Sequence, residues 1–260
     1  MDKLIDRLAA WITESSNIVF FGGAGVSTES GIPDFRSESG LYNAKSKYGR
    51  SPEEIISHSF FTGSPEVFYE YYKDNLLYPD AKPNNAHLAL AALEREGKLL
   101  SVITQNIDGL HQLAGSETVR ELHGSVLRNN CMRCGASYDL AYILNPEHCT
   151  DKSGKKSSVP RCRVCGGMVK PDVVLYEESL DTGVMDAAAR DISSADMLIV
   201  GGTSLVVYPA AGFLNYFRGE RLVLINKSQT GYDSSAGLVI RAPIGEVLHE
   251  ALQLVQTQKG

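Results

Sequence analysis

The stretch Asn17-Ile-Val-Phe-Phe-Gly-Gly-Ala-Gly25 decides the fold class, because in it a short apolar run ends abruptly at a glycine-rich turn. Three further apolar runs end at polar or glycine residues in the same way: residues 99–103 before Thr104, residues 197–200 before Gly201, and residues 222–225 before Asn226. Continuous apolar runs of this length suit strands that are buried on both faces of a parallel sheet. The sequence therefore predicts several such strands.

Helical patterns lie between these runs. Residues 2–14 place apolar side chains at helical spacing, residues 85–96 end before Gly97, a suitable C-cap, and residues 209–217 begin with a proline. Alternating strands and helices indicate an open α/β sheet. Ligands bind such sheets at the carboxyl ends of the strands, so the polar residues that end each run are candidate site residues.

Composition excludes several classes of function. The chain has 260 residues, of which 43% are hydrophobic and 22% charged, and its formal net charge is −6. This is ordinary globular composition, and the acidic balance argues against a protein that binds nucleic acid or an anionic membrane. No apolar run is long enough to span a membrane, and the N-terminus lacks a signal-peptide pattern. We therefore expect a cytosolic protein.

Four of the five cysteines form two C-x-x-C knuckles, Cys131-Met-Arg-Cys134 and Cys162-Arg-Val-Cys165. Paired knuckles are typical of structural zinc bound by four thiolates, and a redox pair is the rival interpretation. No ligand position is left for water, so such a zinc would be structural. Between the knuckles, residues 145–161 read as an exposed loop, in which Cys149 is a free thiol.

The glycine turn differs from that of a dehydrogenase. Gly23-Ala-Gly25 suits close approach to a phosphate, but Thr28 stands where the dinucleotide fingerprint has a third glycine. The fingerprint's acidic residue is missing as well. Asn226, 24 residues after Gly202, could instead hydrogen-bond a ribose hydroxyl. A tight structural turn remains an alternative for the glycines.

The segment Gly31-Ile-Pro-Asp-Phe-Arg36 breaks both helix and strand and presents an aromatic ring beside a guanidinium. A guanidinium can pair with phosphate, and an aromatic ring can shield a flat cationic ring. An incidental surface loop is the alternative.

Taken together, these segments resemble the sirtuins, the NAD-dependent protein deacylases, and most closely the bacterial members. The resemblance covers nearly the whole chain in the family's order. The matching stretches are Gly23-Ala-Gly-Val-Ser-Thr-Glu-Ser-Gly-Ile-Pro-Asp-Phe-Arg36, Thr104-Gln-Asn-Ile-Asp-Gly-Leu-His111, Glu121-Leu-His-Gly124, both cysteine knuckles, Lys170-Pro-Asp-Val-Val-Leu-Tyr-Glu-Glu178, Gly202-Thr-Ser-Leu205 and Ile225-Asn226.

The resemblance implies a Rossmann-like NAD-binding domain made of residues 1–36, 81–128 and 172–260. It also implies a smaller part made of a helical insert, residues 37–80, and a zinc-binding insert, residues 129–171. NAD is the expected co-substrate, and one structural zinc is expected on Cys131, Cys134, Cys162 and Cys165.

The resemblance also implies roles for individual residues. Val173 and Leu175 would pair with an acyl-lysine peptide as an added strand. The segment at residues 242–245 lacks the glycine and aspartate expected there, which makes Ile244 a less secure contact for the adenine. The NAD-contacting residues would be Ala24, Thr28, Phe35, Arg36, Gln105 (nicotinamide ribose), Asn106, Ile107 and Asp108 (nicotinamide), His123, and Gly202, Thr203, Ser204, Asn226 and Ile244 (adenosine half).

His123 is the residue that the resemblance makes the general base, acting on a ribose hydroxyl, with Asn106 positioning a ribose or water. Histidine suits this role because its pKa lies near neutral pH. From its own context, next to Gly124, His123 is more readily interpreted as a turn histidine than as a base. His111 is a rival base, to which the motif leaves a structural hydrogen-bonding role.

The expected reaction transfers the acyl group of an acyl-lysine to ADP-ribose, giving nicotinamide, O-acetyl-ADP-ribose and free lysine. Sirtuins that remove acidic acyl groups carry a Tyr-x-x-Arg pair, and here the matching stretch is Tyr72-Lys-Asp-Asn75. Without the arginine a buried acyl carboxylate would lack a partner, so uncharged acyl groups are preferred, although Lys73 lies nearby.

Other functions stay open at this point. They are deacylation of longer neutral acyl groups, NAD-dependent ADP-ribosylation of proteins, and non-catalytic NAD sensing. We expect a monomer.

Overall fold

A computed structural model describes residues 1–34 and 47–257. Its centre is a six-stranded sheet in the order β11-β10-β9-β1-β2-β3, and every neighbouring pair is parallel. The strands are β1 (Ile18–Gly22), β2 (Leu99–Thr104), β3 (Val119–Glu121), β9 (Met197–Gly201), β10 (Arg221–Ile225) and β11 (Leu238–Ile240). The predicted parallel α/β sheet is confirmed, including all four apolar runs.

The sheet is covered on both faces, which explains why its central strands are apolar throughout. Along β1, Ile18 and Phe20 pack into one cluster and Val19 and Phe21 into the other, because successive side chains of a strand point to opposite faces. One face is covered by α1 (Asp2–Glu14), α6 (Asn85–Arg95) and α10 (Ile244–Thr257), and the other by α9 (Thr182–Ser194) and the 3₁₀ helix η4 (Ala210–Tyr216).

Two helices agree with their sequence signals. In α1 the side chains of Ile5, Leu8 and Ile12 are buried. Helix α6 starts after Asn84, whose side chain accepts a hydrogen bond from the amide of Ala86, and it ends at Arg95, two residues before Gly97, which has a φ of 70°. The α-helix expected at residues 209–217 is instead the 3₁₀ helix η4.

Short elements occupy the loops between the strands. These are the 3₁₀ helices η1 (Ala24–Val26), η2 (Thr28–Ser30) and η5 (Asp233–Ser235) and the single-turn helix α7 (Leu110–Leu113). Among the described residues, no helix is long and apolar enough to cross a membrane.

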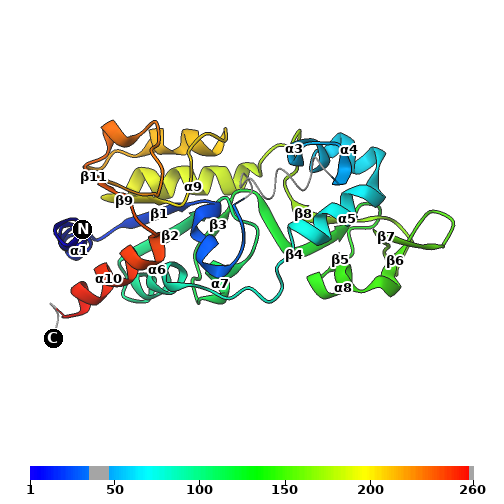
Figure 1. The fold of residues 1–260 in the computed structure, drawn as a ribbon, viewed down its shortest axis with the longest axis horizontal. Helices are drawn as coiled ribbons and strands as arrows, with labels where there is room; N and C mark the ends of the chain where they lie inside the picture. Colours follow the sequence, from blue (N-terminus) through cyan, green and yellow to red (C-terminus); the bar gives the residue numbers. More distant parts are fainter. Residues whose placement is uncertain (35–46, 258–260) are drawn as a thin grey trace.

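A smaller part of the molecule lies beside one end of the sheet (Figure 1). It contains the helices α3 (Pro52–Ile55), α4 (His58–Gly63), α5 (Pro65–Asn75) and α8 (Leu140–Leu144), and an antiparallel sheet of β5 (Ser137–Tyr138), β4 (Gly124–Cys131) and β8 (Val169–Val173). Phe61, Phe68 and Tyr72 share a buried cluster with Val126 and Val169, so the helices and this sheet form one core.

Strands β4 and β8 run across the expected domain boundaries at residues 128–129 and 171–172, and they connect the smaller part to the larger sheet. The domain division by residue number stays a prediction.

The segment at residues 145–161 is more structured than the exposed loop expected from its polar sequence. It contains the 3₁₀ helix η3 (Pro146–His148) and a hairpin of β6 (Cys149–Thr150) and β7 (Lys156–Pro160). Cys149 is buried rather than in an open loop, and its sulfur lies 3.2 Å from the Lys73 ammonium. Only residues around the tip of the hairpin match the expected exposed, polar loop.

Candidate active site

A cavity of about 920 Å³ opens at the carboxyl ends of β1, β2 and β9. This is the position that the strand-end argument indicates for a ligand. Most of the predicted site residues line it: Ala24, Gln105, Asn106, Ile107, Asp108, His123, Val173, Leu175, Gly202, Thr203 and Ser204. Thr28, Asn226 and Ile244 are not among its lining residues, and Phe35 and Arg36 lie outside the described residues.

Two backbone turns meet at the floor of this site. The amide of Gly25 donates to the carbonyl oxygen of Gly202 at 2.8 Å. A Cβ added at Gly25 would lie 2.7 Å from the Gly202 Cα atom, and Gly202 itself has a φ of 61°. The contact therefore requires glycine at both positions. Thr28 supports the same turn, since its hydroxyl donates to the Gly25 carbonyl at 3.0 Å.

Asn106 and Asp108 are held by Ser27, a buried residue that we did not single out in the sequence. The Ser27 hydroxyl donates to an Asp108 carboxylate oxygen at 2.6 Å and accepts from the Asn106 amide at 3.0 Å. The second carboxylate oxygen of Asp108 accepts from the amide of Leu110 at 2.9 Å. These contacts fix both side chains before a ligand enters. Ser27 lies within the segment Gly23–Arg36 that resembles the sirtuins. Its place in this segment is the sequence signal that could have identified it as a site residue.

His123 is oriented by a main-chain oxygen. Its Nδ1 atom lies 3.0 Å from the carbonyl oxygen of Gln105. A carbonyl oxygen only accepts hydrogen bonds, so Nδ1 carries the proton of the neutral ring and Nε2 is left as the basic atom. Burial lowers the pKa of His123 from its ordinary value of 6.5. The ring is therefore neutral near pH 7, as a general base must be.

Gly124 keeps His123 in place. It has a φ of 74°, and an added Cβ would lie 1.9 Å from the carbonyl oxygen of Asp172. The His123 carbonyl in turn accepts from the amide of Val174 at 3.0 Å. Glycine after the histidine is thus required by the close approach of β4 and β8.

His111 does not line the cavity and is only 1% exposed. Its ring lies 4.7 Å from that of His87, and burial together with this neighbour lowers its pKa to about 3. The hydrogen-bonding role expected for His111 is not seen, because neither ring nitrogen has a hydrogen-bond partner among the described residues. As a rival base it is disfavoured by its position.

Thr203 is the centre of the contacts around the predicted adenosine site. The Asn226 side chain accepts from the Thr203 amide at 3.1 Å and donates to the Thr203 carbonyl oxygen, so its amide group is occupied by the loop after β9. The Gln105 side chain donates to the Thr203 hydroxyl at 3.1 Å. Ile244 is buried, and its side chain packs against Gly201. Contacts of these residues with NAD stay predictions.

The four predicted zinc ligands come together in the smaller part of the molecule. Their sulfur atoms all lie within 4.8 Å of one another. Sulfur–sulfur distances of 3.5 Å for Cys131–Cys165 and 3.6 Å for Cys134–Cys162 are too long for disulfides, whose sulfurs lie about 2 Å apart. They fit a tetrahedron of thiolates around zinc.

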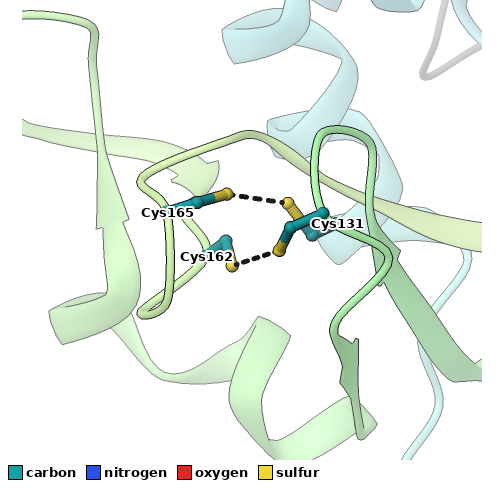
Figure 2. Close-up of side chains that lie close together, drawn as sticks. Cys131, Cys162 and Cys165 are labelled. Carbon is teal, nitrogen blue, oxygen red and sulfur yellow. Dashed lines mark hydrogen bonds between the residues drawn. The ribbon is translucent and has the colours of Figure 1, made fainter.

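Figure 2 shows the sulfurs of Cys131, Cys162 and Cys165 converging from two separate loops. The donor set therefore fits a structural zinc that would hold these loops together.

Three comparisons with known proteins place the chain in a family. The model of the Sir2 family matches residues 23–209. The chain is 58% identical to an NAD-dependent protein deacetylase of Clostridium perfringens, over 97% of this chain and all of that protein. It is 54% identical to one of Cutibacterium acnes, over 94% and 95% of the two chains.

Solved structures agree with this result. A Sir2 homologue in complex with NAD superimposes with a TM-score of 0.84 at 37% identity and covers 98% of this chain and 95% of that one. Sir2Tm bound to a propionylated peptide gives a TM-score of 0.82 at 35% identity, with 96% and 98% covered. The fold and site define a sirtuin-type NAD enzyme. The chain belongs to the Sir2 family.

Proposed function

We propose that this protein is an NAD-dependent protein lysine deacetylase that produces nicotinamide, O-acetyl-ADP-ribose and deacetylated lysine. One observation supports this most directly: the His123 ring, with its basic nitrogen determined by Gln105, lines the same cavity as Asn106 and Asp108. Relatives more than 50% identical over nearly the whole chain are NAD-dependent protein deacetylases.

Each side chain has a defined task in this reaction. NAD supplies the ribose carbon from which nicotinamide leaves and to which the acyl oxygen becomes bonded. His123 Nε2 removes a proton from a ribose hydroxyl. Asp108, held by Ser27, hydrogen-bonds the nicotinamide amide group, and Asn106 positions a ribose hydroxyl or water. The amides of Gly25 and Gly202 donate to the carbonyl oxygens of Gly202 and Ile225, so these two turns shape the site and do not themselves donate to the phosphates.

The lining of the cavity favours uncharged acyl groups. Tyr72 and Asn75 line it, and the Asp74 carboxylate lines it as well. Lys73, the nearby cation, points elsewhere: its ammonium contacts Cys149 and donates to the Ser158 carbonyl oxygen at 3.0 Å. An acidic acyl group would therefore meet no cation from these four residues, and the Asp74 carboxylate is already paired with the Lys47 ammonium at 2.8 Å. Acetyl or a longer neutral chain needs no charged partner.

We propose that the acyl-lysine peptide adds as a strand beside Val173 and Leu175, which line the cavity. We also propose that the protein acts as a monomer. A net charge of −6 disfavours nucleic acid as a partner. A cluster of four thiols suits the reducing cytosol.

The direct test is nicotinamide release in the presence of NAD, measured with and without an acetyl-lysine peptide. Release that requires the peptide and is lost in His123→Ala is expected. Release that is independent of the peptide would favour NAD hydrolysis or transfer to protein, and NAD binding without release would favour a sensor.

A further inference from the structure

The wall of the cavity on the side of the smaller part is formed by residues 173–178, here called the rim segment. Its main chain is hydrogen-bonded to the first residue of α4 and to the loop before this helix. The amide of Tyr176 donates to the Ile56 carbonyl oxygen at 3.1 Å, and the amide of His58 donates to the Tyr176 carbonyl oxygen at 2.9 Å. The rim segment therefore takes its position from a part of the chain far away in sequence.

Two consecutive carboxylates strengthen this attachment. The carboxylate of Glu178 accepts three hydrogen bonds: from His58 Nδ1 at 2.8 Å, from the Lys170 ammonium at 3.0 Å and from the Leu175 amide at 2.9 Å. One side chain thus joins the rim segment, β8 and α4. Partial burial opposes ionisation, but these donors hold the pKa of Glu178 below its usual value, so the carboxylate is charged at neutral pH.

Glu177 makes the second attachment from an unusual backbone conformation. Its φ is 75°, in the left-handed region that favours glycine. Its carboxylate accepts from both the amide and the hydroxyl of Ser59, at 2.8 and 2.9 Å. A strained backbone persists only where the surroundings hold it, and such strain concentrates at functional sites. The two hydrogen bonds from Ser59 hold the left-handed backbone conformation of Glu177.

The contacts of Glu177 and Glu178 affect the binding of a peptide that pairs with the main chain of the rim segment. A peptide that adds as a strand requires its template to be in the right conformation beforehand, because ordering a loop on binding weakens affinity. We propose that Glu177 and Glu178 are positioning residues for the acyl-lysine peptide, which hold the rim segment against α4 so that it is ordered before the peptide binds. The proposal rests on the proposed function, since it concerns the peptide of that reaction.

The Glu178 contact with the Leu175 amide raises an opposite possibility. A peptide carbonyl could compete for this amide, in which case Glu178 would hinder binding. The positioning role is favoured because His58 and Lys170 hold the same carboxylate, which makes it costly to displace. The two roles predict opposite changes in peptide affinity.

The test uses steady-state kinetics of the full-length protein with NAD and an acetyl-lysine peptide. The variants are Glu178→Gln, Glu177→Gln and Ser59→Ala, and Glu250→Gln, an exposed helix residue, is the matched control. We expect the peptide KM to rise about five- to tenfold in the first three, within the range that a typical intramolecular hydrogen bond provides. The kcat and the KM for NAD stay within about twofold of wild type.

Glu177→Gly separates positioning from general stability, because glycine relieves the strained φ while removing the carboxylate. We expect its Tm to be no lower than that of wild type while the peptide KM still rises. An unchanged KM in folded Glu177 and Glu178 variants would overturn the proposal, and so would a lower KM in Glu178→Gln.

If wild type showed no NAD-dependent deacetylation, the proposed function would fail instead. Peptide affinities of the same variants, measured by fluorescence anisotropy, would then decide whether these carboxylates position the rim segment.

Discussion

The Nδ1 atom of His123 lies 3.0 Å from the main-chain oxygen of Gln105, the residue that directly follows β2. This one contact links the candidate base to the strand end that leads into the proposed nicotinamide pocket. It also selects the tautomer, because a carbonyl oxygen can only accept, and so leaves Nε2 as the base. Main-chain geometry rather than a carboxylate partner thus prepares this histidine.

Replacing His123 by alanine should abolish most deacetylation without unfolding the protein. Loss of a general base typically costs about 100- to 10,000-fold in rate. Because the substitution leaves Asn106, Asp108 and the glycine turns intact, NAD binding measured by calorimetry should persist. His249→Ala is the matched control, since His249 is exposed on α10. Near-wild-type turnover by His123→Ala would exclude it as the base.

The acid limb of the rate profile should lie below pH 6.5. The base works when neutral, and burial lowers the pKa of His123 from 6.5. Activity should therefore remain as pH falls through 6.5 and decline only at lower pH. The measurement is kcat/KM for the peptide across pH, with protein stability checked at each point. An acid limb centred above pH 6.5 would contradict this account of the histidine.

Stability should also fall in acid, for a different reason. Burial lowers the pKa of His87 to about 4 and that of His111 to about 3. Between these values and 6.5 the unfolded chain binds protons that the folded protein does not. The two rings therefore contribute stability that is complete above pH 6.5 and is lost progressively as pH falls toward 4 and then 3.

Chemical denaturation at pH 7 and pH 5 measures this loss. In His111→Phe, which replaces one buried ring by an apolar one, the difference between the two pH values should shrink. An equal or larger difference in the variant would contradict the assignment.

Removal of the metal should damage the smaller part of the molecule. Structural zinc contributes about 10–16 kcal/mol of folding free energy in small modules. We expect about one zinc ion per chain by mass spectrometry. Cys134→Ser should lower this content and the Tm, whereas Cys149→Ser, the matched control outside the cluster, should keep its zinc. Equal zinc content in both variants would argue against the four-thiolate site.

The protein should remove acetyl groups faster than succinyl groups. The resemblance to sirtuins implies that Asn75 stands where an arginine would pair with an acyl carboxylate. Asn75 lines the cavity, as does Asp74, whose carboxylate is paired with Lys47. Comparing kcat/KM for matched acetyl- and succinyl-lysine peptides measures the preference, and Asn75→Arg should reduce it. Faster desuccinylation by wild type would refute this interpretation of the cavity.

Much of the fold could be predicted because it follows from burial. Runs such as Ile18–Gly22 are apolar on both faces, which indicates a covered parallel sheet, and the residues after them must lie at its carboxyl edge. The zinc site could be predicted just as directly from the two cysteine knuckles, since structural zinc requires four ligands at close range.

Other features could not be predicted, because they depend on contacts between distant segments. The bond between Glu177 and Ser59 joins residues 118 positions apart, and no local pattern announces it. The role of Asn226 at a ribose stays a prediction, but its hydrogen bond with the Thr203 amide, 23 positions away, could not be predicted. The hairpin that begins at Cys149 lies against α5, where Ser158 is hydrogen-bonded to Glu66 and Lys73, and the sequence pattern of the hairpin alone does not reveal these long-range contacts.

The most direct test of the central claim is the mass of the products formed from NAD and an acetyl-lysine protein. We expect nicotinamide, O-acetyl-ADP-ribose and deacetylated lysine in equal amounts, and each should form at least about 100-fold more slowly with His123→Ala. ADP-ribose attached to the protein, or free acetate released without NAD consumption, would contradict it.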